Sequence, residues 1–329
     1  MYQPEVYGVV LGFMITSMLC WGSWANTLKL CPGFRFQLFY WDYVLGLIVA
    51  SCLWGFTLGS MGTAGQPFLT DVSNAASKSI LLAMVGGAVF NVANLLLVAA
   101  IDIAGLAVAF PIGIGLALVI GAISNYVISP KGNPLLLFGG IAMVVAAILF
   151  DAIAYRKREQ TRAAMSRRGI IISLVAGVLM GCFYPFVSAA MTGNRPLGPY
   201  ASVLYFSIGV AISAIPFNWI LMRKPLDGSK PTSMSEYART GLGPHFWGVL
   251  GGIIWCTGAL FNFISSNAHL VGPAVSYSIG QGATMVSAAW GVFIWREFSA
   301  APAIARRFIA WMFFLFLAGL TSIALAPLY

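Results

Sequence analysis

Ten apolar segments, each as long as a membrane-spanning helix, follow one another along the chain. A helix needs about 20 mainly apolar residues to cross the hydrocarbon core of a bilayer. The ten segments cover residues 6–29, 39–61, 79–100, 103–127, 134–155, 170–192, 199–222, 245–267, 270–294 and 306–327. The sequence therefore predicts an all-α integral membrane protein with ten transmembrane helices.

The composition excludes a water-soluble fold. Hydrophobic residues make up 60% of the chain and charged residues only 8%, whereas a soluble domain carries roughly 25% charged residues. The net charge of +9 sits between the apolar segments, so it indicates membrane topology and not a nucleic-acid partner. The first segment has no basic leader and no A-x-A cleavage site, so we expect it to be a retained span and not a signal peptide.

The basic residues fall unevenly on the two sets of alternating loops. Of 18 lysines and arginines, 15 lie in one set and 3 in the other. The larger set comprises Lys29, Arg35, Arg156, Lys157, Arg158, Arg162, Arg167, Arg168, Arg223, Lys224, Lys230, Arg239, Arg296, Arg306 and Arg307. Positive loops stay in the cytoplasm. We therefore expect a multi-pass protein of the bacterial inner (plasma) membrane, with both termini outside.

Five segments precede the basic middle loop and five follow it, so the two halves would insert with opposite topology. Residues 105–115 (GLAVAFPIGIG) and 272–282 (GPAVSYSIGQG) match at six of eleven positions. They open the fourth and ninth segments, which correspond in such a repeat. The predicted organisation is a first five-helix repeat at 1–155, a basic cytoplasmic linker at 156–169 and a second inverted five-helix repeat at 170–329.

Polar and aromatic side chains inside several segments predict a solute-binding site. Polar groups within a membrane need partners or a wet cavity, and amide side chains both donate and accept hydrogen bonds. The candidate substrate-binding residues are Trp21, Ser23, Trp24, Asn91, Asn94, Tyr184, Asn262, Tyr277 and Gln281. Hydrogen bonding between helices and ordinary aromatic packing are the alternative for each of them.

Prolines and glycines occur within the same segments. Irregular backbone within a membrane is tolerated where it lines a cavity, and small residues also allow close helix packing. The residues that could serve either purpose are Pro111, Gly113, Gly115, Pro185, Gly280 and Gly282.

The carboxylates restrict the coupling ion and the charge of the solute. Asp42, Asp102 and Asp151 are all expected near the cytoplasmic side, and Asp42 is our candidate for coupling to H⁺ or Na⁺. A carboxylate at a helix end is the alternative for Asp42, and facilitated transport stays open. Because no charge is expected at mid-membrane, the solute should be neutral.

Other chemistries lack the residues that they need. With only His245 and His269 and no C-x-x-C, we expect no metal and no cofactor. Neither H-E-x-x-H nor G-x-S-x-G is present, so an enzyme is not expected.

The chain resembles the drug/metabolite transporter superfamily, in particular the glucose/ribose porter branch and the related ureide permeases. The residues that carry the resemblance are Cys20-Trp21-Gly22-Ser23-Trp24, Asp42-Tyr43, Gly59, Gly62, Asn91, Asn94, Gly105, Pro111 and Gly115. The resemblance implies ten helices in two inverted halves and uptake of a small metabolite by alternating access.

Two departures bear on the substrate. The first segment reads Trp24-Ala25-Asn26 where ureide permeases have Trp-Pro, and the middle loop is short. We therefore expect a small neutral solute of the monosaccharide type. The alternatives are a ureide or nucleobase (allantoin, uracil) moved with protons and, more remotely, a lipid-handling protein. The expected partners are the solute and the lipid bilayer, with the oligomeric state open.

Overall fold

The computed structural model of the protein describes residues 1–159 and 166–329, and every regular element in these two ranges is helical. Nine of the described helices are long and apolar enough to cross a membrane, counting α1 and α2 as one. Their bounds are α1 Tyr7–Ser23 with α2 Asn26–Lys29, α3 Phe36–Phe56, α5 Ser77–Ala104, α6 Leu106–Ile128, α7 Pro134–Glu159, α8 Arg167–Ala190, α9 Pro199–Arg223, α11 Leu242–Asn267 and α14 Ala303–Leu325.

The ninth predicted span, 270–294, is present but interrupted. It consists of α12 (Pro273–Gly280), α13 (Ala283–Ala289) and a π-helical turn, η1 (Trp290–Ile294). Gln281 and Gly282 form the interruption, where flanking glycines relax the backbone. The predicted ten crossings are therefore nine long helices and one broken segment. Two short helices, α4 (Phe68–Asn74) and α10 (Met234–Arg239), lie outside the bundle.

The outer surface of the bundle is apolar. Large side chains such as Ile212 (55% exposed), Phe293 (66%) and Leu317 (59%) point away from the core. A soluble protein rarely exposes so much apolar surface, whereas lipid tails solvate it without cost. This surface confirms the prediction of an integral membrane protein.

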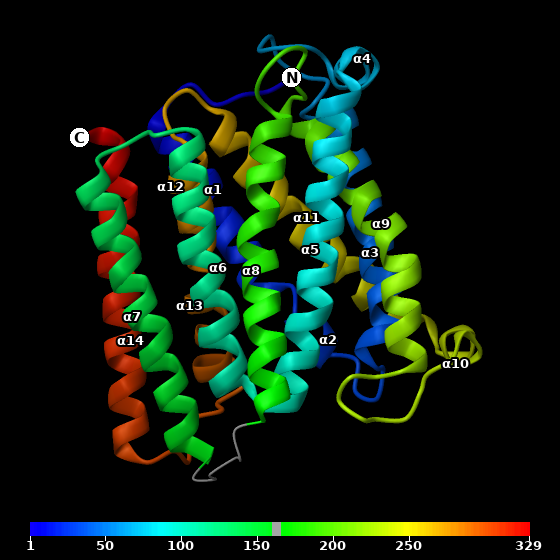
Figure 1. The fold of residues 1–329 in the computed structure, drawn as a ribbon, viewed down its shortest axis with the longest axis vertical. Helices are drawn as coiled ribbons and strands as arrows, with labels where there is room; N and C mark the ends of the chain where they lie inside the picture. Colours follow the sequence, from blue (N-terminus) through cyan, green and yellow to red (C-terminus); the bar gives the residue numbers. More distant parts are fainter. Residues whose placement is uncertain (160–165) are drawn as a thin grey trace.

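The helices run up and down between two ends of the molecule (Figure 1). Both termini and α4 lie at one end, which we call the terminal end. The helices α2 and α10, the end of α7 and the start of α8 lie at the other, which we call the basic end. Lys29, Arg158 and Arg223 lie in the last turns of helices that finish at the basic end. The predicted alternation of the loops is thus present.

The packing follows the relation between two inverted halves. Helix α5 packs on α8 and α9, just as α11 packs on α1 and α3, while α7 pairs with α14. Glycines permit the close approaches. A Cβ added to Gly252 on α11 would lie 2.0 Å from the carbonyl oxygen of Tyr43 on α3, and a Cβ added to Gly87 on α5 would lie 2.0 Å from that of Phe206 on α9.

Several helix limits differ from the predicted ones. Helix α5 continues to Ala104, so Asp102 lies in its last turn and not in a loop; the chain turns at Gly105, whose φ is +77°. Helix α7 runs to Glu159 because lysine and arginine favour a helical C-terminus, so the predicted linker is helical at 156–159 and 167–169. The repeat boundaries themselves stay a prediction.

Neither of the two prolines that could break a helix or serve helix packing interrupts its helix. Pro111 lies inside the continuous helix α6, and Pro185 lies inside the continuous helix α8. A proline removes one backbone hydrogen bond, and packing against neighbouring helices lets a helix in a membrane continue through it.

Candidate functional site

A central cavity of about 270 Å³ lies between α1, α5, α6, α8, α11 and the interrupted ninth span. Aromatic rings form most of its wall. They belong to Trp21, Trp24, Phe36, Phe90, Phe110, Phe183 and Trp255. The polar side chains of the wall are those of Asn94, Gln281, Thr284 and Ser287. None of the described residues that line this cavity is charged, so it suits a neutral solute.

The aromatic wall is held by ring contacts that extend behind it. Trp21 stacks on Trp255 with ring centroids 5.7 Å apart and planes 19° apart. Phe90 contacts Trp255 at 4.3 Å, and Phe206 stacks on the same indole at 5.7 Å. Aromatic contacts of this kind contribute about 0.5–1.5 kcal/mol each beyond the apolar area that they bury. The rings therefore present a preformed flat surface to a ligand.

Two hydrogen-bond donors in this wall lack protein partners. The side-chain nitrogens Asn94 Nδ2 and Trp21 Nε1 are both buried, and neither has an acceptor within the described part of the chain. An unsatisfied buried donor costs about 1–3 kcal/mol. A solute that reaches these two groups could therefore accept a hydrogen bond from each of them.

A polar hollow of about 290 Å³ adjoins the cavity on the side of the basic end, and we call it the vestibule. It shares Ala25, Phe110, Thr284 and Ser287 with the cavity, so the two spaces meet. Its other polar and charged lining residues are Asn26, Lys29, Asp151, Tyr155, Arg158 and Glu297. The cavity is thus reached from the basic end.

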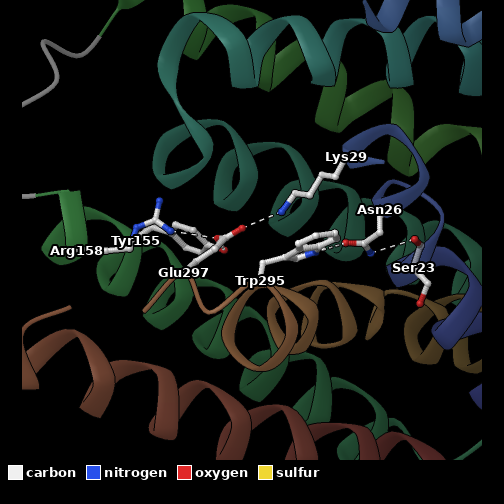
Figure 2. A network of polar contacts seen from close by, with 7 residues as sticks. All are labelled: Ser23, Asn26, Lys29, Tyr155, Arg158, Trp295 and Glu297. Atoms are coloured by element: carbon white, nitrogen blue, oxygen red, sulfur yellow. Dashed lines mark hydrogen bonds and ion pairs between the residues drawn. The ribbon is translucent and has the colours of Figure 1, made fainter. Parts of the chain in front are cut away.

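Glu297 is the centre of a charged network in the vestibule (Figure 2). Its carboxylate accepts hydrogen bonds from Lys29 Nζ at 2.8 Å, from Arg158 Nη1 at 3.1 Å and from the Tyr155 hydroxyl at 3.0 Å. Burial acts to raise the pKa of Glu297, but the hydrogen bonds and positive charges of Lys29 and Arg158, together with the Tyr155 hydroxyl, outweigh it and hold this pKa below its usual value. Glu297 is therefore a stable anion that ties α2 and α7 to the loop after η1.

Two indole hydrogen bonds extend this network along α1 and α2. Trp290 Nε1 donates to Ser23 Oγ at 2.9 Å, and Trp295 Nε1 donates to Asn26 Oδ1 at 2.7 Å. Figure 2 shows Ser23 and Asn26 side by side with Trp295. Ser23, a predicted substrate ligand, is thus engaged between helices and does not line the cavity.

On the opposite side of the cavity, a buried polar cluster closes the path to the terminal end. The Tyr184 hydroxyl donates to Asn262 Oδ1 at 2.5 Å, and Asn262 Nδ2 donates to Ser17 Oγ at 3.2 Å and to the Ser276 carbonyl at 2.9 Å. Ser17 lies one turn, and Asn262 two turns, nearer the terminal end than Trp21 and Trp255 of the wall. This cluster therefore lies between the cavity wall and the terminal end.

We expect a Tyr184→Phe variant to lose stability without losing affinity for the solute. Removal of the hydroxyl leaves Asn262 Oδ1 buried and unsatisfied, which costs about 1–3 kcal/mol. Thermal unfolding and the KM of uptake measure the two effects. Tyr205→Phe is the matched control, because the Tyr205 hydroxyl makes only a 3.4 Å contact with the Val72 carbonyl. Unchanged stability with a raised KM would instead place Tyr184 in contact with the solute.

The structure divides the predicted site residues into groups. Trp21, Trp24, Asn94 and Gln281 line the cavity. The remaining ones bind other parts of the protein: Tyr184 and Asn262 join the closed cluster, Tyr277 donates to the carbonyls of Ala117 and Met180, Asn91 accepts from the Tyr40 hydroxyl at 2.8 Å, and Ser23 accepts from Trp290.

Asp42, the predicted coupling residue, lies apart from both hollows. It is 3% exposed and accepts hydrogen bonds from the Tyr237 hydroxyl at 2.6 Å, and its other oxygen lies 2.8 Å from His245 Nδ1. These contacts fasten α3 to α10 and α11. Its role in coupling stays a prediction.

The predicted glycines differ in what surrounds them. A Cβ on Gly280 would lie 2.7 Å from the Trp21 ring and 2.8 Å from Asn262 Nδ2, so this glycine admits two side chains close to the backbone. Gly113 and Gly282 face Leu97 and Met18 closely, whereas a Cβ on Gly115 would meet nothing within 4 Å. The packing interpretation thus fits the first three and not Gly115.

Thr284 and Ser287 were missed as lining residues. They follow Gln281 at intervals of three, which places all three on one face of a helix. This spacing, added to the polarity of Gln281, is the sequence signal that could have found them. Asp151 was placed near the cytoplasmic surface because its helix was expected to end at 155.

Comparisons with known proteins show the family of the chain. The family model described as "Sugar transport protein" (Sugar_transport) matches residues 45–325. Ureide permease 2 of Arabidopsis thaliana is 24% identical over 97% of this chain and 97% of its own length. Probable ureide permease A3 of Vigna unguiculata is 30% identical over 80% of this chain and 90% of its own length.

A solved structure titled only "Crystal structure of protein" shares the fold. Its TM-score is 0.60 at 16% identity, over 96% of this chain and 98% of the other. A shared fold at this low identity does not identify the family. The family model does, because it matches most of the chain. The protein belongs to the Sugar_transport family and is a multi-pass membrane transporter related to the ureide permeases.

Proposed function

We propose that the protein is a secondary transporter, not an enzyme, that moves a small neutral polar metabolite by alternating access, with a monosaccharide as its first candidate substrate. The observation that carries the proposal is the uncharged aromatic cavity in which Asn94 Nδ2 and Trp21 Nε1 have no partner in the described protein. Aromatic faces pack on the apolar face of a sugar ring, while amide and hydroxyl side chains bind its hydroxyl groups.

The unequal shapes of the two halves support alternating access. The first span is interrupted at Trp24 and Ala25, and the ninth at Gln281 and Gly282. Their counterparts in the inverted repeat, α8 and α6, run without interruption. Two halves of related sequence thus hold different shapes, and their exchange of shape would open the cavity to the terminal end.

The asymmetry of basic residues supports an inward-open state. If the basic end faces the cytoplasm, the vestibule opens to the cytoplasm and both termini lie outside. Such a state is the one in which a transporter releases an imported solute. We place the protein in a cytoplasmic membrane on the same grounds.

A ureide or nucleobase is the second candidate substrate. The names of the ureide permeases to which the chain is similar favour it, and so do the two amides of the wall. Asn94 and Gln281 can pair with the amide edges of a flat ligand, while Trp21 and Trp255 offer a surface for stacking. Both candidate classes are neutral, as the uncharged lining requires.

Ligand-dependent thermal stabilisation of the detergent-purified protein tests the proposal. A ligand that binds only the folded state stabilises it by about 2.7 kcal/mol at 100 times its Kd. D-glucose, D-ribose, allantoin, uracil and adenine form the panel, each followed by counterflow in proteoliposomes. We expect a monosaccharide to give the largest shift. A shift confined to allantoin or the bases selects the second class, and no shift and no counterflow with any compound would overturn the proposal.

A further inference from the structure

A groove on the lipid-facing surface lies between the end of the ninth span and α14, and its volume is about 460 Å³. Its apolar lining includes Val292 and Phe293 of η1 and Ile309 and Phe313 of α14. Its polar lining consists of Arg296, Ser299 and Arg306. The groove therefore combines a hydrocarbon surface with two cations and a hydroxyl group.

The cations lie at one end of the groove and the apolar side chains continue away from them. Arg306 and Phe313 are seven residues apart on α14, which places them on one face of the helix. Helix α14 begins at the basic end (Figure 1), so Phe313 lies about 10 Å further into the membrane, at 1.5 Å per residue. Arg296 adjoins Glu297 of the vestibule network at the same end. A molecule in the groove thus meets positive charge at the membrane surface and apolar side chains below it.

The guanidinium groups of Arg296 and Arg306 have no partner within the described part of the chain. Neither makes a hydrogen bond or an ion pair there, and both residues are exposed. The adjacent carboxylate, Glu297, lines the vestibule and binds Lys29 and Arg158 instead. Two positive charges beside one apolar groove therefore stay uncompensated by protein.

The backbone after η1 separates two opposite charges. Arg296 has a φ of +52°, a left-handed conformation that residues with a side chain rarely adopt. Arg296 lines the groove, whereas the next residue, Glu297, lines the vestibule. The turn thus directs one charge to the lipid-facing side and the opposite charge to the inside of the protein.

We propose that this groove binds an anionic diacyl phospholipid of the membrane. The lipid phosphate accepts hydrogen bonds from Arg296 and Arg306, whose forked donors fit a phosphate, and from the Ser299 hydroxyl. One acyl chain lies on Phe293 and Phe313, whose ring centroids are 5.8 Å apart. Basic pockets between helices on the cytoplasmic side of a membrane bind such headgroups.

The chemistry of the groove favours this occupant over two others. A free phosphate ion would leave the apolar part of the groove without a ligand. A second copy of the chain, inserted in the same direction, would bring its own basic end to the arginines, because 15 of the 18 basic residues lie on that side. An anionic lipid matches both the charge and the apolar surface.

Two other apolar grooves carry arginines but fit a phosphate less well. The groove beside Phe150 and Trp311 has one arginine, Arg307. In the groove along α8, Arg167 and Arg168 are consecutive residues, so they diverge by about 100° around the helix axis. The groove between η1 and α14 takes its two arginines from separate segments, so they can face one phosphate from two sides.

A lipid in the groove would also fasten the interrupted ninth span to α14. Phe298, which lines the groove, lies 5.3 Å from the guanidinium carbon of Arg158 and 5.1 Å from the ring centroid of Tyr155. The groove is thus directly behind the vestibule network. We therefore expect the bound lipid to stabilise the folded protein.

Native mass spectrometry of the purified full chain in detergent tests the site. The probes are dioleoylphosphatidylglycerol, which is anionic, and dioleoylphosphatidylcholine, which is zwitterionic. Each arginine beside an anionic headgroup contributes about fivefold in affinity, so the double variant Arg296→Gln and Arg306→Gln should bind phosphatidylglycerol about 25-fold more weakly than the wild type. The control Arg156→Gln and Lys157→Gln removes two exposed charges that line neither the vestibule nor the groove, and should bind like the wild type.

Four outcomes would overturn the proposal. The first is equal affinity of the wild type and the arginine double variant for phosphatidylglycerol, and the second is equal affinity of the wild type for the two lipids. The third is displacement of the lipid by an equal concentration of inorganic phosphate, which would show an anion site without a role for the acyl chain. The fourth is a two-chain species that disappears in the arginine double variant, which would assign the groove to a second copy.

Arg296→Gly decides the question if the glutamine variants cannot be purified. Glycine adopts a positive φ without strain, so we expect this variant, free of lipid, to unfold at or above the wild-type Tm. It should nevertheless bind phosphatidylglycerol about fivefold more weakly and gain less Tm than the wild type in phosphatidylglycerol nanodiscs. Wild-type affinity in Arg296→Gly would show that Arg296 serves the turn alone and would reject its role in lipid binding.

Discussion

A Gly252→Ala variant is expected to lose most of its folded protein, although it adds a single methyl group. The added Cβ would lie 2.0 Å from the Tyr43 carbonyl oxygen and 2.9 Å from Gly46 Cα. Both contacts are with backbone, which cannot rotate away as a flexible side chain can, so α11 and α3 must separate. Overpacking of this kind costs about 1–3 kcal/mol and occasionally more. Fluorescence-detected size-exclusion chromatography and the apparent Tm measure the loss.

The inverted repeat supplies a second test and a control. Gly87→Ala should have the same effect on the α5–α9 contact, since its Cβ would lie 2.0 Å from the Phe206 carbonyl oxygen. Gly115→Ala adds the same methyl group within a helix where it meets nothing within 4 Å, and should leave stability equal or raise it by about 1 kcal/mol. If all three variants unfold at the wild-type temperature, close helix approach does not limit the stability of this bundle.

The fold was predictable because few kinds of fold can span a bilayer. Continuous apolar length identified nine spans directly, and the basic residues identified which loops share an end. The matching windows at 105–115 and 272–282 indicated the repeat. Yet the same match hid a difference: Gly113 and Gly280 occupy equivalent positions, but only the segment after Gly280 is interrupted. The two windows are similar and not identical: Gln281, at the interruption, corresponds to Ile114 in the continuous helix α6.

The site was only partly predictable, because polarity in a membrane has two explanations that sequence does not separate. Asn94 and Asn262 are both buried amides in long helices, yet one faces a cavity and the other binds Ser17 and Ser276. Which occurs depends on partners that other helices supply, such as Ser17, which is 245 residues from Asn262 in the sequence. Asp151 was expected near the cytoplasmic side, and it lines the vestibule on the side of the basic end; α7 continues eight residues beyond it, through the basic residues that marked its expected end.

A Trp21→Ala variant is expected to lose solute transport while remaining folded. The indole is half-buried, forms one wall of the cavity and offers an unpaired Nε1–H. Loss of ring stacking (about 0.5–1.5 kcal/mol) and of one hydrogen bond (about 0.5–1.5 kcal/mol) predicts a decrease in kcat/KM of roughly 5- to 150-fold. Initial rates of counterflow in proteoliposomes, with the protein content of each preparation matched, measure this decrease.

Two further tryptophan variants separate the contribution of ring stacking from that of the hydrogen bond. Trp21→Phe keeps a ring on Trp255 but removes the donor, so we expect it to recover the stacking part and to remain severalfold below the wild type. Trp311→Ala is the control, because this indole on α14 is 56% exposed on the lipid-facing surface and far from the cavity lining. Trp21 Nε1 has no partner in the described part of this structure. Its hydrogen bond should therefore contribute only when the solute is bound. A Trp21→Phe variant as active as the wild type would therefore show that the indole nitrogen binds water and not the substrate.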